Sequence, residues 1–158
     1  SAVKRQLAEI AFYGNNEIDC YLIGLTALPT FIYRDYKEVS FWNKEHQAFL
    51  EESLRQLGWD FEWVDDRIGM VTPRVLMMII NEAAYTLEAG IASKEAIDIS
   101  MKKGVNYPMG PFEWADKIGI QDVFETLEAL HEDTKDPRYK ICPLLKTMYF
   151  KEEGFWVT

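Results

Sequence analysis

The chain has 158 residues, of which 48% are hydrophobic and 27% are charged, a composition that suits a folded domain rather than a disordered segment. The formal net charge of −9 disfavours nucleic acid as a partner, because an acidic surface repels phosphate backbones. No apolar run reaches the roughly 18 residues expected of a membrane-spanning helix, so we expect no membrane partner.

The first 66 residues predict short strands and helices. Residues 3–12 place Val3, Leu7 and Ile10 at helical spacing and predict a short helix, and a turn is expected at 14–16. Three stretches rich in β-branched and aromatic residues predict strands: 18–25, 36–41 and 60–64. Between the last two strands, the apolar spacing of Phe49, Leu50, Leu54 and Leu57 predicts a helix. That helix covers residues 44–57, with an N-cap at Asn43 and its end at Gly58.

From residue 67 onward the pattern predicts helices alone. The longest helix is expected to begin near Pro73, which suits a first helical turn, and to end near Ala89. Its apolar residues form more than one narrow stripe, which indicates burial both in its own core and against a second subunit. Four shorter helices are predicted in the rest of the chain: 94–103 after a Ser93 cap, 111–118, 121–132 and 143–150. We therefore expect an α+β fold, with a small sheet segment at 1–66 and a helical domain at 67–158.

The cysteines and histidines give no sign of a metal or disulfide framework. Cys20 and Cys142 are far apart in the sequence and indicate buried thiols. His46 and His131 have no Cys or His at ligand spacing, so we expect no metal site. Few cysteines and no basic-then-apolar opening segment fit a cytoplasmic protein. The chain begins at Ser1 rather than Met, which fits a processed form or a piece of a longer protein.

The glycine pattern argues against a dinucleotide site in this chain. Such a site needs a glycine-rich turn between the first strand and helix, where backbone N–H groups hold the pyrophosphate. The nine glycines include no two that are two residues apart, and 66 residues are too few for two βαβαβ halves. We expect this chain alone to bind no NAD.

The segment NYPMGP at residues 106–111 has an unusual composition that helps to identify a family. Several further segments fit the same pattern: NEA at 81–83, SKEAID at 93–98 and PLL at 143–145. GFW at 154–156 stands in place of the usual ending of that pattern, and the basic, glycine-containing stretch that normally precedes the ending is missing. Over residues 18–156 the chain resembles the C-terminal domain of the 3-hydroxyacyl-CoA dehydrogenases, NAD-linked enzymes of fatty-acid β-oxidation and butyrate metabolism. The resemblance implies a helical domain that completes an acyl-CoA site and forms a homodimer. It also implies that residues 1–66 are only the last part of a Rossmann-like NAD domain.

The same resemblance places changed residues at two site positions. The family pattern around the catalytic histidine, Gly-Leu-His-Phe-Phe-Asn-Pro, aligns with residues 24–30, so Thr26 stands where the family has histidine. Glu38 matches the glutamate that orients this histidine, although a solvated strand carboxylate is an alternative reading. The motif Pro-Gly-Phe-Ile-Val-Asn-Arg aligns with residues 68–74, so Pro73 replaces the asparagine. Threonine cannot serve as a base that titrates near neutrality, and proline has no side-chain hydrogen-bonding group.

These observations predict a 3-hydroxyacyl-CoA dehydrogenase homologue that lacks the NAD motif and the catalytic histidine and asparagine. Such a chain would serve as a non-catalytic dimerisation or acyl-CoA-binding module. Two alternatives stay open. The chain could be part of an active NAD-dependent 3-hydroxyacyl-CoA or 3-hydroxybutyryl-CoA dehydrogenase whose cofactor domain lies outside it, or a structural dimer without a ligand.

Overall fold

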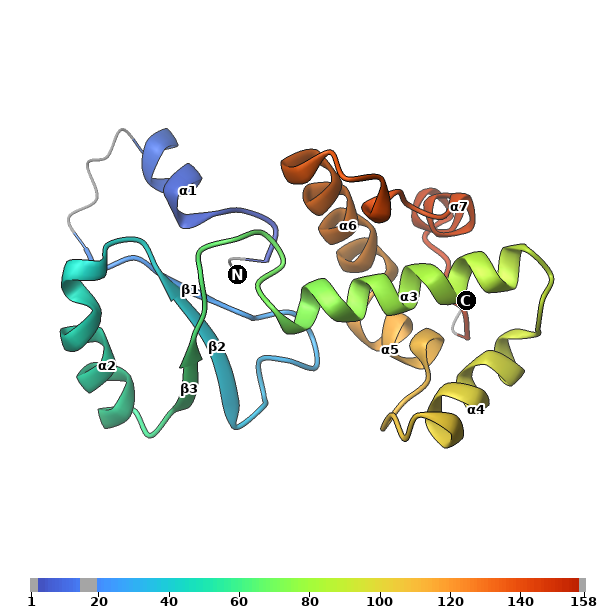
Figure 1. The fold of residues 1–158 in the computed structure, drawn as a ribbon, viewed down its shortest axis with the longest axis horizontal. Helices are drawn as coiled ribbons and strands as arrows, with labels where there is room; N and C mark the ends of the chain where they lie inside the picture. Colours follow the sequence, from blue (N-terminus) through green and yellow to red (C-terminus); the bar gives the residue numbers. More distant parts are fainter. Residues whose placement is uncertain (1–2, 15–19, 157–158) are drawn as a thin grey trace. The chain divides into compact units, whose positions relative to one another are not determined.

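The computed structural model of the chain describes residues 3–14 and 20–156, and the chain divides into two compact units, Ser1–Arg74 and Val75–Thr158. The first unit holds a three-stranded sheet and the second is helical (Figure 1), so the predicted α+β class is confirmed. The sequence-based boundary at 66 and 67 lies earlier, before the turn that leads into the long helix. Within the described ranges, no helix is long and apolar enough to cross a membrane.

The sheet has the order β1-β2-β3, with β1 (Ile23–Leu25) antiparallel to β2 (Tyr36–Phe41) and β3 (Asp60–Trp63) parallel to β2. The prediction of β2 is confirmed at both ends. The prediction of a strand at 18–25 is wrong in length, because Ile23 already pairs with Phe41, the last residue of β2. Within the described part of the chain, residues 20–22 have no partner in β2, and residues 18 and 19 lie outside that part.

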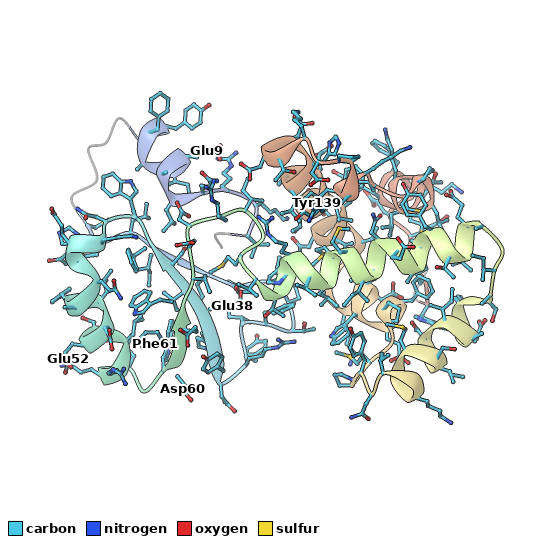
Figure 2. All side chains as sticks on the ribbon, in the orientation of Figure 1. Glu9, Glu38, Glu52, Asp60, Phe61 and Tyr139 are labelled. Atoms are coloured by element: carbon cyan, nitrogen blue, oxygen red, sulfur yellow. The ribbon has the colours of Figure 1, made fainter. Side chains whose placement is uncertain are left out.

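The two faces of the sheet differ in character because side chains alternate along each strand. Phe41, Phe61 and Trp63 share one face, where the Phe41 and Trp63 ring centroids are 5.0 Å apart. Figure 2 shows Phe61 between β3 and the helix α2 (Gln47–Gln56), whose Arg55 guanidinium lies 5.8 Å from the Phe61 ring centroid. Tyr36 and Glu38 therefore point to the opposite face of β2, whereas Lys37, paired with Phe61, lies on the aromatic face.

The helix α1 (Leu7–Tyr13) is shorter than the predicted 3–12. It begins at Leu7 because the Asp66 carboxylate accepts hydrogen bonds from the backbone N–H groups of Leu7 (2.8 Å) and Ala8 (3.1 Å). A carboxylate at this place satisfies N–H groups that have no partner inside the helix. The predicted face of Val3, Leu7 and Ile10 is only partly correct: Val3 and Leu7 are buried, whereas Ile10 is 38% exposed. Of the turn predicted at 14–16, only Gly14 is described, and residues 15 and 16 lie outside the described ranges.

The helix predicted at 44–57 begins with a 3₁₀ turn, η1 (Lys44–His46), before α2. The Asn43 side chain accepts a hydrogen bond from the Glu45 N–H at 3.0 Å, as expected of an N-cap. Leu50 and Leu54 are buried, but the predicted apolar positions Phe49 and Leu57 are exposed. Gly58 lies just beyond the end of α2, as predicted, and its φ of +72° is a left-handed conformation that glycine adopts without strain.

The second unit contains the helical domain that the sequence predicts. The helices are α3 (Thr72–Glu88), which begins at the end of the first unit, α4 (Lys94–Gly104), α5 (Pro111–Ile118), α6 (Ile120–Thr134) and α7 (Pro143–Lys151), with a 3₁₀ turn η2 (Pro137–Tyr139). The Ser93 side chain accepts a hydrogen bond from the Ala96 N–H at 3.2 Å, as its capping position predicts. In Figure 1, α4, α5, α6 and α7 gather along α3, and apolar side chains such as Met77, Phe112 and Leu127 form the core between them.

The NYPMGP segment is held in place by a buried carboxylate. Asp98 of α4 is 2% exposed and accepts hydrogen bonds from the N–H groups of Phe112 (2.9 Å) and Glu113 (3.2 Å). The Trp156 indole also donates to Asp98, at 3.0 Å. Asp98 therefore caps α5 and ties it to the C-terminal segment. The most distinctive sequence motif of the chain thus has a structural role.

The two cysteines differ in their surroundings. Both are free thiols, and the prediction of a buried thiol is confirmed for Cys142. The same prediction is wrong for Cys20, which is exposed. Cys20 precedes the first paired residue of β1, Ile23, so it lies outside the sheet that was expected to cover it.

Candidate functional site

Glu38 projects from β2 in the first unit (Figure 2) and binds the start of α3. One carboxylate oxygen, Oε1, accepts hydrogen bonds from the Thr72 N–H at 2.8 Å and from the Thr72 hydroxyl. The other, Oε2, accepts one from the Val71 N–H at 3.0 Å. These N–H groups have no acceptor within the helix, and a negative charge at a helix N-terminus is favourable. Glu38 therefore acts as a cap for α3, contributed by a residue distant in sequence.

Thr26 lies beside Glu38, as the alignment of the two positions predicts. The Thr26 side chain is buried, and its Oγ1 lies 3.4 Å from Glu38 Oε2 and 3.1 Å from Met70 Sδ. The single hydroxyl proton can serve one of these acceptors at a time. The structure thus keeps the spatial pairing of positions 26 and 38, but with a hydroxyl in place of a group that could take up a proton near neutral pH. The role of Glu38 as a retained catalytic residue stays a prediction.

Pro73 is fully buried in the first turn of α3, as its sequence position predicts. Its missing N–H costs little there, because the first N–H groups of a helix have no intrahelical acceptor. The preceding turn is fixed by Gly69, at φ +82°, and by Arg74, whose N–H donates to the Gly69 carbonyl at 3.0 Å. Pro73 supplies apolar surface and no hydrogen-bonding group to this region.

A cavity of about 190 Å³ lies beside these residues, entirely within the first unit. Its lining combines two predicted site positions, Thr26 and Glu38, with five further residues: Thr72, Phe31, Arg34, Tyr36 and Lys37. Sequence reasoning did not identify these five. The only available signal was a pair of basic residues, Arg34 and Lys37, in an acidic part of the chain, and spacing alone does not show that they face Thr26.

The two basic residues that line the cavity have different surroundings. The Lys37 ammonium donates to the carbonyls of Ile32 (3.1 Å) and Arg34 (2.7 Å), so it holds the loop before β2. The Arg34 guanidinium lies 4.3 Å from the centroid of the Phe31 ring. At the outer edge, the Tyr36 hydroxyl donates to Glu62 at 3.0 Å. This hydrogen bond, followed by burial and the charges of Glu62 and Asp60, raises the pKa of Tyr36.

The second unit has a larger hollow of about 710 Å³. Its lining includes three carboxylates, from Asp116, Glu152 and Glu153, and the ring of Phe150. An acidic lining opposes the binding of the phosphate groups of coenzyme A, so this hollow is the weaker candidate for an acyl-CoA site. No group of three or more His, Cys, Asp or Glu side chains in the described ranges could hold a metal ion.

Residues 69–153 match the sequence profile of a protein family described as 3-hydroxyacyl-CoA dehydrogenase, C-terminal domain. Curated relatives include a 3-hydroxybutyryl-CoA dehydrogenase of Bradyrhizobium diazoefficiens, which is 41% identical over 95 residues, 60% of this chain and 32% of the relative. A probable 3-hydroxybutyryl-CoA dehydrogenase of Bacillus subtilis is 47% identical over 83 residues, 52% of this chain and 29% of the relative. The chain thus spans about a third of the length of these relatives.

Solved structures show the same likeness beyond the helical part. The (S)-3-hydroxybutyryl-CoA dehydrogenase of Ralstonia eutropha superposes with a TM-score of 0.74 at 32% identity, covering 82% of this chain and 47% of that one. The 3-hydroxybutyryl-CoA dehydrogenase of Escherichia coli K12 gives a TM-score of 0.79 at 26% identity, covering 94% of this chain and 30% of that one. The likeness therefore includes most of the first unit as well as the second.

Proposed function

Because the chain belongs to the 3-hydroxyacyl-CoA dehydrogenase family through its C-terminal domain, we propose that it is a non-catalytic module that binds acyl-CoA and forms a homodimer. The named relatives are dehydrogenases of 3-hydroxybutyryl-CoA, a reaction that oxidises a 3-hydroxyl group to a 3-oxo group or runs in reverse. For this chain we propose the binding of such a thioester without its turnover.

One observation carries the non-catalytic part of the proposal. Both oxygens of the Glu38 carboxylate are occupied by the N–H groups of Val71 and Thr72 and by the Thr72 hydroxyl. Removal of a proton from a hydroxyl as hydride leaves requires a base within hydrogen-bond reach, with a pKa near the working pH. Thr26 is no such base, and Glu38 is committed to holding α3.

The cavity beside Thr26 supports the binding part of the proposal. Its volume of about 190 Å³ is below the roughly 300–1,000 Å³ of pockets that enclose a whole drug-sized ligand. It would therefore hold the acyl end of a thioester and leave the nucleotide part of coenzyme A outside. The Thr26 hydroxyl, whose contact with Glu38 is long at 3.4 Å, can turn its proton to the thioester carbonyl in this cavity.

The proposal of a homodimer rests on α3. Buried side chains such as Met77, Ile80 and Ala84 form the core stripe of this helix. A second apolar stripe follows Val75, which is 56% exposed, and continues with the half-buried Met78 and Ile79. An apolar stripe outside the core of a unit is suited to contact with another subunit.

Sedimentation velocity tests the dimer. We expect a dimer for the unmodified chain and a monomer for Val75→Asp, which places a charge on the second stripe. Val105→Asp is the matched control, because Val105 is 54% exposed but follows the end of α4, away from that stripe. A monomeric unmodified chain at tens of micromolar would overturn this part of the proposal.

A second candidate function is part of an active NAD-dependent 3-hydroxyacyl-CoA dehydrogenase whose cofactor domain lies outside this chain. Two observations favour it. The chain spans only about a third of the length of its curated relatives, and Thr26 stays within 3.4 Å of the Glu38 carboxylate. In that case another group would have to serve as the base. A cytoplasmic location is proposed in either case, on the low cysteine usage alone.

The direct test is NADH-dependent reduction of acetoacetyl-CoA at high protein concentration. We expect no turnover by the chain alone, or by a fusion that carries the nucleotide-binding half of the B. diazoefficiens relative in front of it. The same fusion with Thr26→His and Pro73→Asn should gain turnover if those two positions are what is missing. Turnover by the fusion without these changes, abolished by Glu38→Gln, would establish the second candidate instead. Saturable binding of butyryl-CoA, measured by calorimetry, would exclude a dimer without a ligand.

A further inference from the structure

The cavity beside Thr26 has one basic side chain, from Arg34, in an acidic chain. The net charge of the chain is −9, and the charged residues that line the cavity are Arg34, Lys37 and Glu38. Lys37 lies on the other face of β2 from Glu38, with its ammonium 5.3 Å from the centroid of the Trp59 ring, so Arg34 is the basic side chain of the cavity. Glu38 is already compensated, because its oxygens accept hydrogen bonds from the N-terminal N–H groups of α3. The cavity therefore offers an attractive site to a negatively charged group.

Arg34 is the residue in the cavity that is available to bind such a group. Its guanidinium lies over the Phe31 ring, 4.3 Å from the centroid, and Phe31 is itself 4% exposed. Among the described residues, no carboxylate forms an ion pair with Arg34. Contact of the guanidinium with an aromatic ring favours a fixed orientation while leaving N–H donors for a carboxylate, which Arg can bind through two parallel hydrogen bonds.

Lys37 positions the loop that carries Arg34. Its ammonium is committed to the carbonyls of Ile32 and Arg34 itself, so Lys37 holds the backbone of the binding residue. Thr30, in the same loop, adopts φ +72°. A left-handed conformation is rare and strained for a β-branched residue, and such strain is concentrated at functional sites.

From these observations we propose that the cavity takes the terminal carboxylate of a dicarboxylic acyl group, with Arg34 as the residue that binds it. This inference rests on the proposed acyl-CoA binding and names the class of acyl group. A volume of about 190 Å³ corresponds to about six water molecules at roughly 30 Å³ each. The cavity thus has room for a short acyl chain and its carboxylate, while the Thr26 and Thr72 hydroxyls lie along its wall.

The test compares two thioesters that differ only at the far end of a five-carbon chain. Glutaryl-CoA ends in a carboxylate and pentanoyl-CoA in a methyl group, and both carry the same coenzyme A phosphates. Calorimetry with the full chain should give about tenfold tighter binding of glutaryl-CoA, the size expected of a charged hydrogen-bonded pair at a partly exposed site. Arg34→Gln should remove this preference and leave pentanoyl-CoA binding within about twofold. Arg55→Gln, on α2, is the matched control and should keep the preference.

The outcomes separate this inference from the proposal on which it rests. Equal affinity for the two thioesters would overturn the role of Arg34 and leave acyl-CoA binding intact. If neither thioester binds, the binding of free glutarate is measured. Binding of glutarate that is lost in Arg34→Gln would support the carboxylate site and overturn acyl-CoA binding. No binding of glutarate or of either thioester would overturn both.

Discussion

Gly110 lies so close to Asp98 that a β-carbon at position 110 would stand 2.2 Å from the Asp98 Cγ. Real β-carbons do not approach another heavy atom this closely. The contact exists because the Asp98 carboxylate reaches past Gly110 to the N–H groups of Phe112 and Glu113. The Glu113 carboxylate in turn accepts a hydrogen bond from the Gly110 N–H at 3.0 Å. Glycine at position 110 therefore allows Asp98 to cap α5.

Gly110→Ala should lower the free energy of unfolding by about 1–3 kcal/mol, the usual effect of added methylene groups in a packed interior. Urea unfolding followed by circular dichroism measures the change. Gly104→Ala is the matched control, because a β-carbon there meets nothing within 4 Å and alanine is the better helix former. A Gly110→Ala protein as stable as the Gly104→Ala protein would contradict the close contact with Asp98.

Asp98 should also give the chain an unusual dependence of stability on pH. Burial raises the pKa of Asp98 above its ordinary 3.8, against the opposing effect of the hydrogen bonds from Phe112, Trp156 and Glu113. Between 3.8 and the raised pKa, the folded chain binds more protons at this site than the unfolded chain. The contribution of Asp98 to stability is therefore largest below 3.8 and decreases as pH rises through the raised pKa.

Asp98→Asn removes this titration. The free energy of unfolding of the unmodified chain minus that of Asp98→Asn should therefore decrease as pH rises. Any constant cost of the substitution leaves this trend unchanged. Urea unfolding of both proteins at several acidic and neutral pH values measures it. A difference that does not change with pH, or that shifts in favour of the unmodified chain, would contradict a raised pKa.

The sequence predicts most of the fold because the decisive signals are local. Helix α5 begins and ends where Pro111 and the following apolar residues predict, and Ser93 and Asn43 cap the turns expected of them. The prediction errors occur where a residue distant in sequence determines where a helix or strand begins. β1 begins at Ile23 because β2 ends at Phe41, and α1 begins at Leu7 because Asp66 lies at its N-terminus.

The candidate site was predictable only in part for the same reason. Alignment with the family brings Thr26 and Glu38 together, as observed. No sequence pattern predicts that Glu38 binds Thr72, since that contact joins a strand to a helix start far along the chain. Arg34 belongs to a loop whose path depends on a left-handed Thr30. Because proline is confined to negative φ, the family's aligned proline could not adopt this conformation, so this loop departs from the family pattern.

Glu38→Ala should destabilise the chain by about 1–2 kcal/mol, because it removes the acceptor for the N–H groups at the start of α3. Thermal or urea unfolding measures the loss. Glu62→Ala is the control: Glu62 lies on the neighbouring strand and accepts one exposed hydrogen bond, from Tyr36, so its loss should change stability by no more than about 0.5 kcal/mol. Equal effects of the two substitutions would mean that Glu38 is an ordinary surface carboxylate.

Thr30→Gly should stabilise the chain although it deletes a side chain. At φ +72° a β-branched residue has a strain of about 1–3 kcal/mol, and the buried Thr30 Oγ1 has no hydrogen-bond partner in the described structure. Glycine removes both costs. The greater entropy of glycine in the unfolded state opposes this by about 0.5–1 kcal/mol, so the free energy of unfolding should rise by about 1 kcal/mol.

Thr147→Gly is the control. Thr147 lies inside α7 with its hydroxyl bonded to the Pro143 carbonyl, so this substitution should lower the free energy of unfolding by about 1 kcal/mol. If both substitutions destabilise alike, Thr30 is not strained. If Thr30→Gly gains stability but weakens glutaryl-CoA binding, the strain serves to hold Arg34 at the cavity.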